Sequence, residues 1–136
     1  MTLCDAGPLV ALIDQSDAHH ERCAATLEAL PYSGLLTTWP CLTEAMYLLH
    51  RNLGWPGQSE LWGLVVEGAV ELYQPADDEW ARIRELMRRY VDAPMDLADA
   101  SLVSAAEQLD QRRVFTIDRH FHAYRQQEGH AFEVVP

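Results

Sequence analysis

The 136-residue chain is long enough for one domain with a substantial core, and 49% hydrophobic with 23% charged residues is typical of a globular protein. The formal net charge of −11 at pH 7 argues against a basic nucleic-acid-binding surface, unless bound divalent ions reverse the local field. All ten basic residues are arginine. The absence of lysine disfavours P-loop nucleotide binding, Schiff-base chemistry and phosphotransfer domains that depend on a lysine.

The first half of the chain alternates short apolar runs with apolar residues at helical spacing. Pro8 suits the first position of a helix, and Ser16 or Asp17 can cap the next one. The predicted elements are a strand at 3–5, helices at 9–13 and 17–30, a strand at 35–39, a helix from 40 through at least 49, a loop at 54–57 and a helix at 59–67.

The second half of the chain continues the alternation. Asp77 or Asp78 can cap one helix, and Asp96 can cap the following one. The predicted elements are a strand at 70–73, a helix over 80–87, a helix over 97–106, a strand at 114–117, a short helix at 124–127 and a last strand at 132–135. Strands that alternate with helices require parallel pairing through right-handed crossovers, so the predicted fold class is α/β.

Targeting and redox features of the sequence are few. The spacing of Cys4, Cys23 and Cys41 matches neither a zinc site nor a disulfide framework, so we expect buried apolar thiols. We see no signal peptide and no apolar run that could span a bilayer, so we expect a cytoplasmic protein without membrane contact. Without a repeat or a linker, residues 1–136 are predicted to form a single domain.

Four acidic residues lie where four separate apolar segments end: Asp5, Glu44, Asp99 and Asp118. The carboxyl ends of parallel strands share one edge of a sheet, where open α/β sheets place their sites. Clustered carboxylates repel one another unless a hard cation neutralises them. The pattern therefore predicts a Mg²⁺ or Mn²⁺ site, and a site built only from carboxylates points to phosphoryl chemistry.

Each of these acids also has a purely structural interpretation. Asp5 can cap the helix that follows it, and Glu44 can be an exposed first-turn acid favoured by the helix dipole. Asp96 and Asp99 share a helix face; we expect Asp99 to be the ligand, and Asp96 to be the cap or an indirect support. Asp118 can simply form a turn.

Two neighbours of Asp118 are candidates for contact with a substrate. Thr116 lies one strand period earlier and could hydrogen-bond the same site, while Arg119 could hold a phosphate. The six histidines show no pairing typical of a metal site, and no GxSxG motif supports a Ser-His-Asp triad.

Four segments of the chain match a known family. They are LCDAGPL at residues 3–9, TE at 43–44, MDLADASL at 95–102 and FTIDRHF at 115–121. In this order and spacing the chain resembles the PIN-domain nucleases, and specifically the VapC-type toxins of bacterial toxin–antitoxin pairs. The resemblance covers nearly the whole chain.

The resemblance implies a three-layer PIN-like fold, with a central parallel sheet of about five strands flanked by helices. It also implies cleavage of RNA with Mg²⁺ or Mn²⁺, neutralisation by a cognate antitoxin, and a homodimer to which Trp55, Trp62 and Trp80 could contribute unless they are core residues. The matching metal and catalytic positions are Asp5, Glu44, Asp99 and Asp118, with Asp96 and Thr116 as further matching positions.

The sequence thus leads to one main hypothesis and two alternatives. The main hypothesis is a metal-dependent, single-strand-preferring endoribonuclease. The first alternative is a PIN-like module for protein binding with a residual metal site and little nuclease activity, which the negative charge favours. The second is a metal-dependent phosphomonoesterase, which would turn over small phosphate esters.

Overall fold

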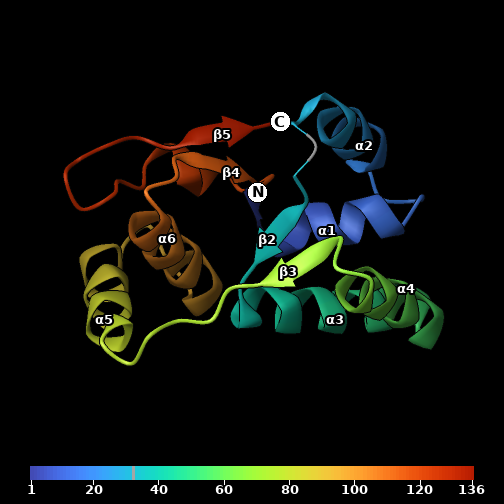
Figure 1. Ribbon diagram of the computed structural model, residues 1–136, viewed down its shortest axis with the longest axis horizontal. Coiled ribbons are helices and arrows are strands. Elements are labelled where there is room, and N and C mark those ends of the chain that lie inside the picture. The colour runs from blue at the N-terminus through green and yellow to red at the C-terminus, as the bar shows by residue number, and fades with distance from the viewer. Residues whose placement is uncertain (32) are drawn as a thin grey trace.

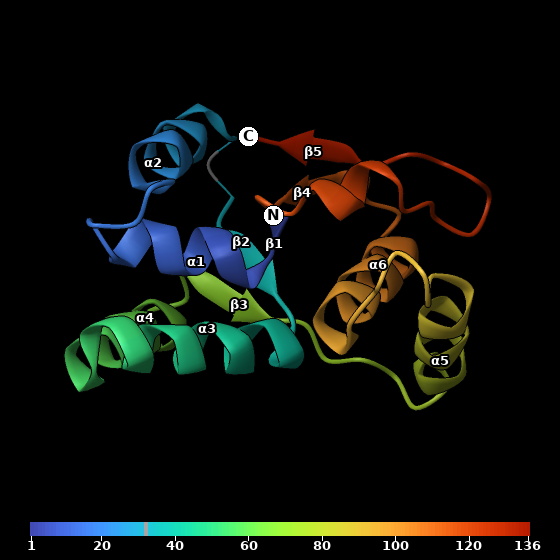
Figure 2. The same cartoon turned by 180° about the vertical axis from the view of Figure 1, so that it is seen from behind.

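The centre of the molecule is a parallel β-sheet with helices on both faces (Figures 1 and 2). The structure is a computed structural model that describes residues 1–31 and 33–136. In this part of the chain five strands pair in the order β3-β2-β1-β4-β5, and every pairing is parallel. The strands are β1 (Thr2–Cys4), β2 (Leu35–Thr37), β3 (Val70–Leu72), β4 (Arg113–Phe115) and β5 (Glu133–Val135).

Side chains alternate between the two faces of the sheet, and each face has its own core. Leu3 and Val114 point to one core, while their neighbours Cys4 and Phe115 point to the other. The first core packs against α5 (Glu79–Arg89) and α6 (Leu97–Leu109). The second packs against α1 (Ala6–Ile13), α2 (His20–Ala29), α3 (Trp39–Leu53) and α4 (Trp55–Val66). The predicted three-layer α/β architecture is confirmed.

The order of the strands creates a crevice at one edge of the sheet. From β1 the chain proceeds through β2 to β3 on one side, and then returns to β4 and β5 on the other side of β1. Such a reversal leaves the carboxyl ends of the two central strands uncovered by a crossover, which is where ligands bind in open α/β sheets. The register pairs Cys4 with Phe115, so the residues after β1 and β4 face each other there.

Apart from the short helix at 124–127, the predicted strands and helices are present with shifted bounds, and the largest of these shifts concerns α4. This helix begins at Trp55, so the predicted loop at 54–57 reduces to Gly54, which has a φ of +69°. Pro56 occupies the first turn, where its missing N–H costs nothing. A Cβ on Gly57 would lie 2.9 Å from Cβ of Leu53, so this glycine allows α3 and α4 to approach closely.

The predicted short helix at 124–127 is wrong. A 3₁₀ helix, η1, occupies Arg119–His122 instead, because the Asp118 side chain accepts a hydrogen bond from the N–H of His120 directly after the strand. Tyr124 is fully buried, and Arg125 forms an isolated antiparallel bridge with Ala131.

The predicted caps of two helices are wrong in detail. The N-cap position of α2 is His19, which makes no side-chain cap. Asp17 instead accepts a hydrogen bond from the N–H of His19 at 2.8 Å. Asp78 stands at the N-cap of α5 without capping it, while Glu79 accepts a hydrogen bond from the N–H of Ala76.

Two further expectations concern the cysteines and the membrane. All three cysteines are buried and free, as expected. Within the described residues, no helix is both long and apolar enough to cross a membrane.

Candidate active site

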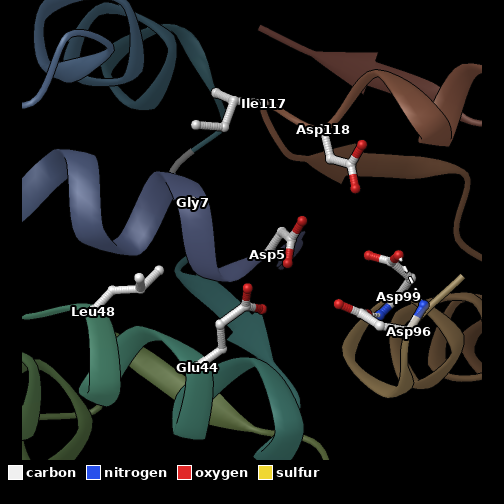
Figure 3. Close-up of a pocket in the computed structure, with 8 residues that line it drawn as sticks. All are labelled: Asp5, Gly7, Glu44, Leu48, Asp96, Asp99, Ile117 and Asp118. Carbon is white, nitrogen blue, oxygen red and sulfur yellow. Dashed lines mark hydrogen bonds between the residues drawn. The ribbon is translucent and has the colours of Figure 1, made fainter. Parts of the chain in front are cut away.

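A pocket with a volume of about 170 Å³ opens at the crevice and contains all five acids predicted from the sequence (Figure 3). The carboxylates project toward one space from α1, α3, α6 and the loop after β4. The residues that line the pocket are Asp5, Gly7, Glu44, Leu48, Asp96, Asp99, Ile117 and Asp118.

Asp5 links the end of β1 to the start of α1. One carboxylate oxygen, Oδ1, accepts a hydrogen bond from the N–H of Ala6 at 2.7 Å, so Asp5 is the N-cap of α1. The other, Oδ2, accepts one from Oγ1 of Thr116 at 2.8 Å. Burial raises the pKa of Asp5, the hydrogen bonds from Thr116, Ala6 and the thiol of Cys41 oppose this, and the charge of Asp118 adds to the increase.

Gly7 lets α1 pass close to the segment that follows β4. A Cβ at this position would lie 2.7 Å from Cγ1 of Ile117, closer than two carbon atoms can approach without displacement. The Asp5-Ala6-Gly7 sequence therefore provides a helix cap followed by a close contact between the two segments that carry Asp5 and Asp118.

Asp96 and Asp99 form a reciprocal capping box at the start of α6. Oδ1 of Asp96 accepts a hydrogen bond from the N–H of Asp99 at 2.8 Å, and Oδ2 of Asp99 accepts one from the N–H of Asp96 at 3.3 Å. The hydroxyl of Tyr124 also donates to Oδ2 of Asp99, at 3.1 Å. Burial, followed by the charges of Asp96 and Asp5, raises the pKa of Asp99 to about 7.

Glu44 approaches the pocket from one turn inside α3. Its side chain is more exposed than those of Asp5 and Asp99. Partial burial raises its pKa, and the charges of Asp5, Asp96 and Asp118 add to the increase. Glu44 is therefore coupled electrostatically to the other acids although it comes from a different element.

Asp118 and its two sequence neighbours complete the rim. The N–H of Asp118 donates to Oγ1 of Thr116 at 3.0 Å, and Oδ1 of Asp118 accepts from the N–H of His120 at 2.9 Å. The Nδ1 atom of His120 lies 2.9 Å from the same oxygen. Thr116 is only 2% exposed, so its position suits orientation of Asp5 better than contact with a substrate, whereas Arg119 is exposed on η1.

Tyr124 belongs to the site although no sequence pattern predicts it there. The one hint in the sequence is the pair Phe121 and Tyr124, three residues apart. The hint is weak because the surrounding segment is polar and is predicted to contain a short helix. In the structure both rings are buried and meet edge to face, with centroids 5.1 Å apart. This packing positions the Tyr124 ring so that its hydroxyl donates a hydrogen bond to Asp99.

Comparison with known proteins supports the sequence resemblance. No family model matches the chain. The chain is 28% identical over 137 residues to ribonuclease VapC26 of Mycobacterium tuberculosis, an alignment that covers 98% of this chain and 99% of the relative.

Solved structures show the same fold. VapC20 of M. tuberculosis, described as a sarcin-ricin loop cleaving toxin, matches with a TM-score of 0.84 at 18% identity and covers 100% of both chains. VapBC2 from Rickettsia felis, solved with a DNA fragment from its promoter, matches with a TM-score of 0.67 at 14% identity and covers 99% of this chain and 98% of that chain.

The fold is therefore the PIN-domain fold of VapC-type proteins, with a carboxylate-lined pocket at the switch point of its sheet. The predicted resemblance to VapC-type toxins is confirmed by the full-length sequence match to VapC26 and by the shared fold.

Proposed function

We propose that this protein is a metal-dependent endoribonuclease, that residues 1–136 act as one PIN domain, and that it is the toxin of a toxin–antitoxin pair. The observation that carries the proposal is the convergence of five carboxylates in one pocket at the switch point of the sheet. The relatives support the reaction, since one is named a ribonuclease and another is described as a sarcin-ricin loop cleaving toxin.

The chemistry of the pocket fits a hard divalent cation. All the candidate ligands are carboxylate oxygens, which Mg²⁺ and Mn²⁺ prefer. Burial is the main cause of the raised pKa values of Asp5, Glu44 and Asp99, and the negative charges of neighbouring carboxylates add to the increase, so a bound cation would relieve part of it. The described residues include no group of three or more His, Cys, Asp or Glu side chains already arranged to hold an ion, so ion binding would require the carboxylates to draw closer together. The proposed ligands are Asp5, Glu44, Asp99 and Asp118, with Asp96 as the support of Asp99.

The protein groups would orient the ligands and the substrate. Thr116 and the N–H of Ala6 hold Asp5, while Tyr124 and the N–H of Asp96 hold Asp99, so both carboxylates keep their direction toward the pocket. A bound ion would supply an activated water and neutralise charge on the phosphodiester. Arg119, exposed beside Asp118, would contact a phosphate oxygen of the RNA.

The direct test is cleavage of a panel of single-stranded and structured RNAs with Mg²⁺, with Mn²⁺ and with chelator. We expect cleavage that requires metal and is lost in Asp99→Asn but kept in Asp77→Asn, which removes an exposed carboxylate that does not line the pocket. Full activity of folded Asp99→Asn would contradict the assignment of the site, and activity in chelator would contradict the metal requirement. Turnover of small phosphate esters would favour the phosphomonoesterase instead. If the protein shows no cleavage and metal causes no thermal shift, the protein-binding module would be favoured.

The proposed partners are an RNA substrate and a cognate antitoxin. The likeness in fold to VapBC2, which was solved with promoter DNA, supports an antitoxin partner. A cytoplasmic location is part of the proposal, because the protein would meet an RNA substrate there. We expect that co-expression with the antitoxin protects cells from a toxin that is otherwise harmful, and that the pocket substitution removes the harm.

A homodimer remains part of the proposal. Trp55, Trp62 and Trp80 are 63%, 41% and 55% exposed, which excludes the alternative that they are core residues. Trp55 and Trp62 lie seven residues apart on one side of α4. Size-exclusion chromatography with light scattering would show a dimer, and a monomer at all concentrations would contradict this part of the proposal.

A further inference from the structure

The acidity of the pocket raises the question of which groups attract the RNA. The chain has a net charge of −11, so any cation available near the pocket matters. Most arginines are engaged, for example Arg82 with Glu107 and Arg113 with Glu133. Among the residues that the structure describes, three arginines have no hydrogen bond, ion pair or aromatic ring contact: Arg51, Arg84 and Arg119.

Arg51 lies on the same side of α3 as two pocket residues, but farther along the helix. Glu44 and Leu48 line the pocket, and Arg51 follows them by seven and three residues, which places all three along one side of the helix. The 1.5 Å rise per residue puts Arg51 about 10 Å along the axis from Glu44. That spacing places Arg51 two turns along α3 from Glu44, on the same side of the helix.

Tyr47 stands between these two positions. It follows Glu44 by three residues and precedes Arg51 by four, and it is 65% exposed. The opposite side of α3 is buried, since Leu42, Ala45 and Leu49 contribute to the core. Tyr47 is therefore an exposed aromatic residue on a firmly packed helix, three residues after the pocket residue Glu44.

We propose that Tyr47 and Arg51 form an RNA subsite on α3 that binds the nucleotide next to the cleaved bond. An exposed aromatic ring and a cation that follow one another along a helix match the needs of single-stranded RNA, because bases stack on aromatic rings and arginine binds phosphate. Arg119 would hold the strand on the other side of the carboxylates. The subsite rests on the proposed nuclease function, and it explains how an acidic chain without lysine retains its substrate.

RNA binding tests the subsite separately from catalysis. Fluorescence anisotropy of a labelled single-stranded RNA would be measured with Asp99→Asn protein, which prevents cleavage. Adding Tyr47→Leu should weaken binding by about tenfold, while Tyr47→Phe should preserve binding, because stacking needs the ring and not the hydroxyl. Arg51→Gln should weaken binding by about fivefold and lower the slope of log K against log salt by about 0.7, the value for one phosphate contact on a single strand.

The matched control is Arg84→Gln, which removes the same charge from an exposed arginine on α5. It should change the affinity less than twofold and leave the salt dependence unaltered. Arg51 lies in the last turn of α3 and also complements the helix dipole, so thermal stability is measured alongside. Arg51→Lys keeps the charge and should keep most of the affinity.

Cleavage kinetics in the wild-type background separate the two proposals. The subsite variants should raise KM while leaving kcat within about twofold, because they remove binding that is equal in the ground state and the transition state. If the wild-type protein neither binds nor cleaves RNA, the proposed function fails and the subsite with it. If the wild type cleaves and Tyr47→Leu and Arg51→Gln behave like Arg84→Gln, the subsite alone is overturned.

Discussion

The substitution Asp99→Asn should stabilise the metal-free protein at neutral and alkaline pH. Asp99 is buried among acids that raise its pKa from 3.8 to about 7. At about 1.4 kcal/mol per pH unit, that increase corresponds to about 4 kcal/mol against the ionised form in the folded state. Asparagine preserves the capping geometry, because the Tyr124 hydroxyl and the N–H of Asp96 both donate to the same oxygen, Oδ2.

The difference between the pKa of Asp99 in the unfolded and in the folded protein determines how folding stability changes with pH. In the unfolded chain Asp99 loses its proton near pH 3.8, whereas the folded protein keeps it up to about pH 7. Folding stability therefore falls as the pH rises through this window, and the full loss persists above it. We expect about half of the 4 kcal/mol to be measurable, because neighbouring carboxylates can turn into solvent. The Tm of Asp99→Asn at pH 8 should then exceed that of the wild type by roughly 6 °C.

The assay is thermal and urea unfolding in chelator at pH 5 and pH 8. The control Asp77→Asn also removes one negative charge, from an exposed position outside the pocket. Asp77→Asn should shift the Tm little and equally at both pH values. A wild type that is as stable at pH 8 as at pH 5, or an Asp99→Asn protein no more stable than the control, would refute the electrostatic reasoning.

Three further predictions follow from the same contacts. Mg²⁺ or Mn²⁺ should raise the Tm of the wild type, more at pH 8 than at pH 5 because protons compete for the carboxylates; an equal rise in Asp99→Asn would contradict a metal site there. Gly7→Ala should cost about 1–3 kcal/mol, since its Cβ would lie 2.7 Å from Cγ1 of Ile117, whereas Gly63→Ala, which meets open space within α4, should stabilise by about 0.5–1 kcal/mol in urea unfolding. Thr116→Val should cost about 1–2 kcal/mol and reduce cleavage, because Oγ1 both donates to Asp5 and accepts from the next loop; Thr116→Ser should restore both, and equal behaviour of the two variants would contradict this role.

The acids of the site could be predicted from the sequence because their positions depend on local patterns. Short apolar runs that alternate with helices dictate a parallel sheet, and a parallel sheet brings residues that end its strands to one edge. This pattern predicts the positions of Asp5, two residues before Gly7, and of Asp118, directly after Phe115-Thr116-Ile117. Glu44 was harder to assign, because a first-turn acid on a helix looks the same whether it faces solvent or a pocket.

The misplaced elements depend on packing that local patterns do not report. Gly54, Pro56 and Gly57 together resemble a loop, yet proline fits the first turn of a helix and Gly57 is needed where α3 and α4 meet. Tyr124 lies in a polar stretch that was predicted to be helical. Its ring packs against Phe121, three residues before it, and against Tyr90, which comes from a distant part of the chain, while Phe132 packs on Phe121.

For Asp5 and Asp99, a role in capping a helix is compatible with the proposed role as a metal ligand. Asp5 and Asp99 accept hydrogen bonds from backbone N–H groups at the starts of α1 and α6, where the helix dipole favours negative charge. Capping thus offsets part of the repulsion among the carboxylates while fixing their direction toward the pocket. Glu44, inside α3, has no such compensation and is the most free to turn into solvent. We therefore expect capping to keep the acids together before any cation binds. Burial and the remaining repulsion, which together raise the pKa of Asp99, would then favour binding of a cation.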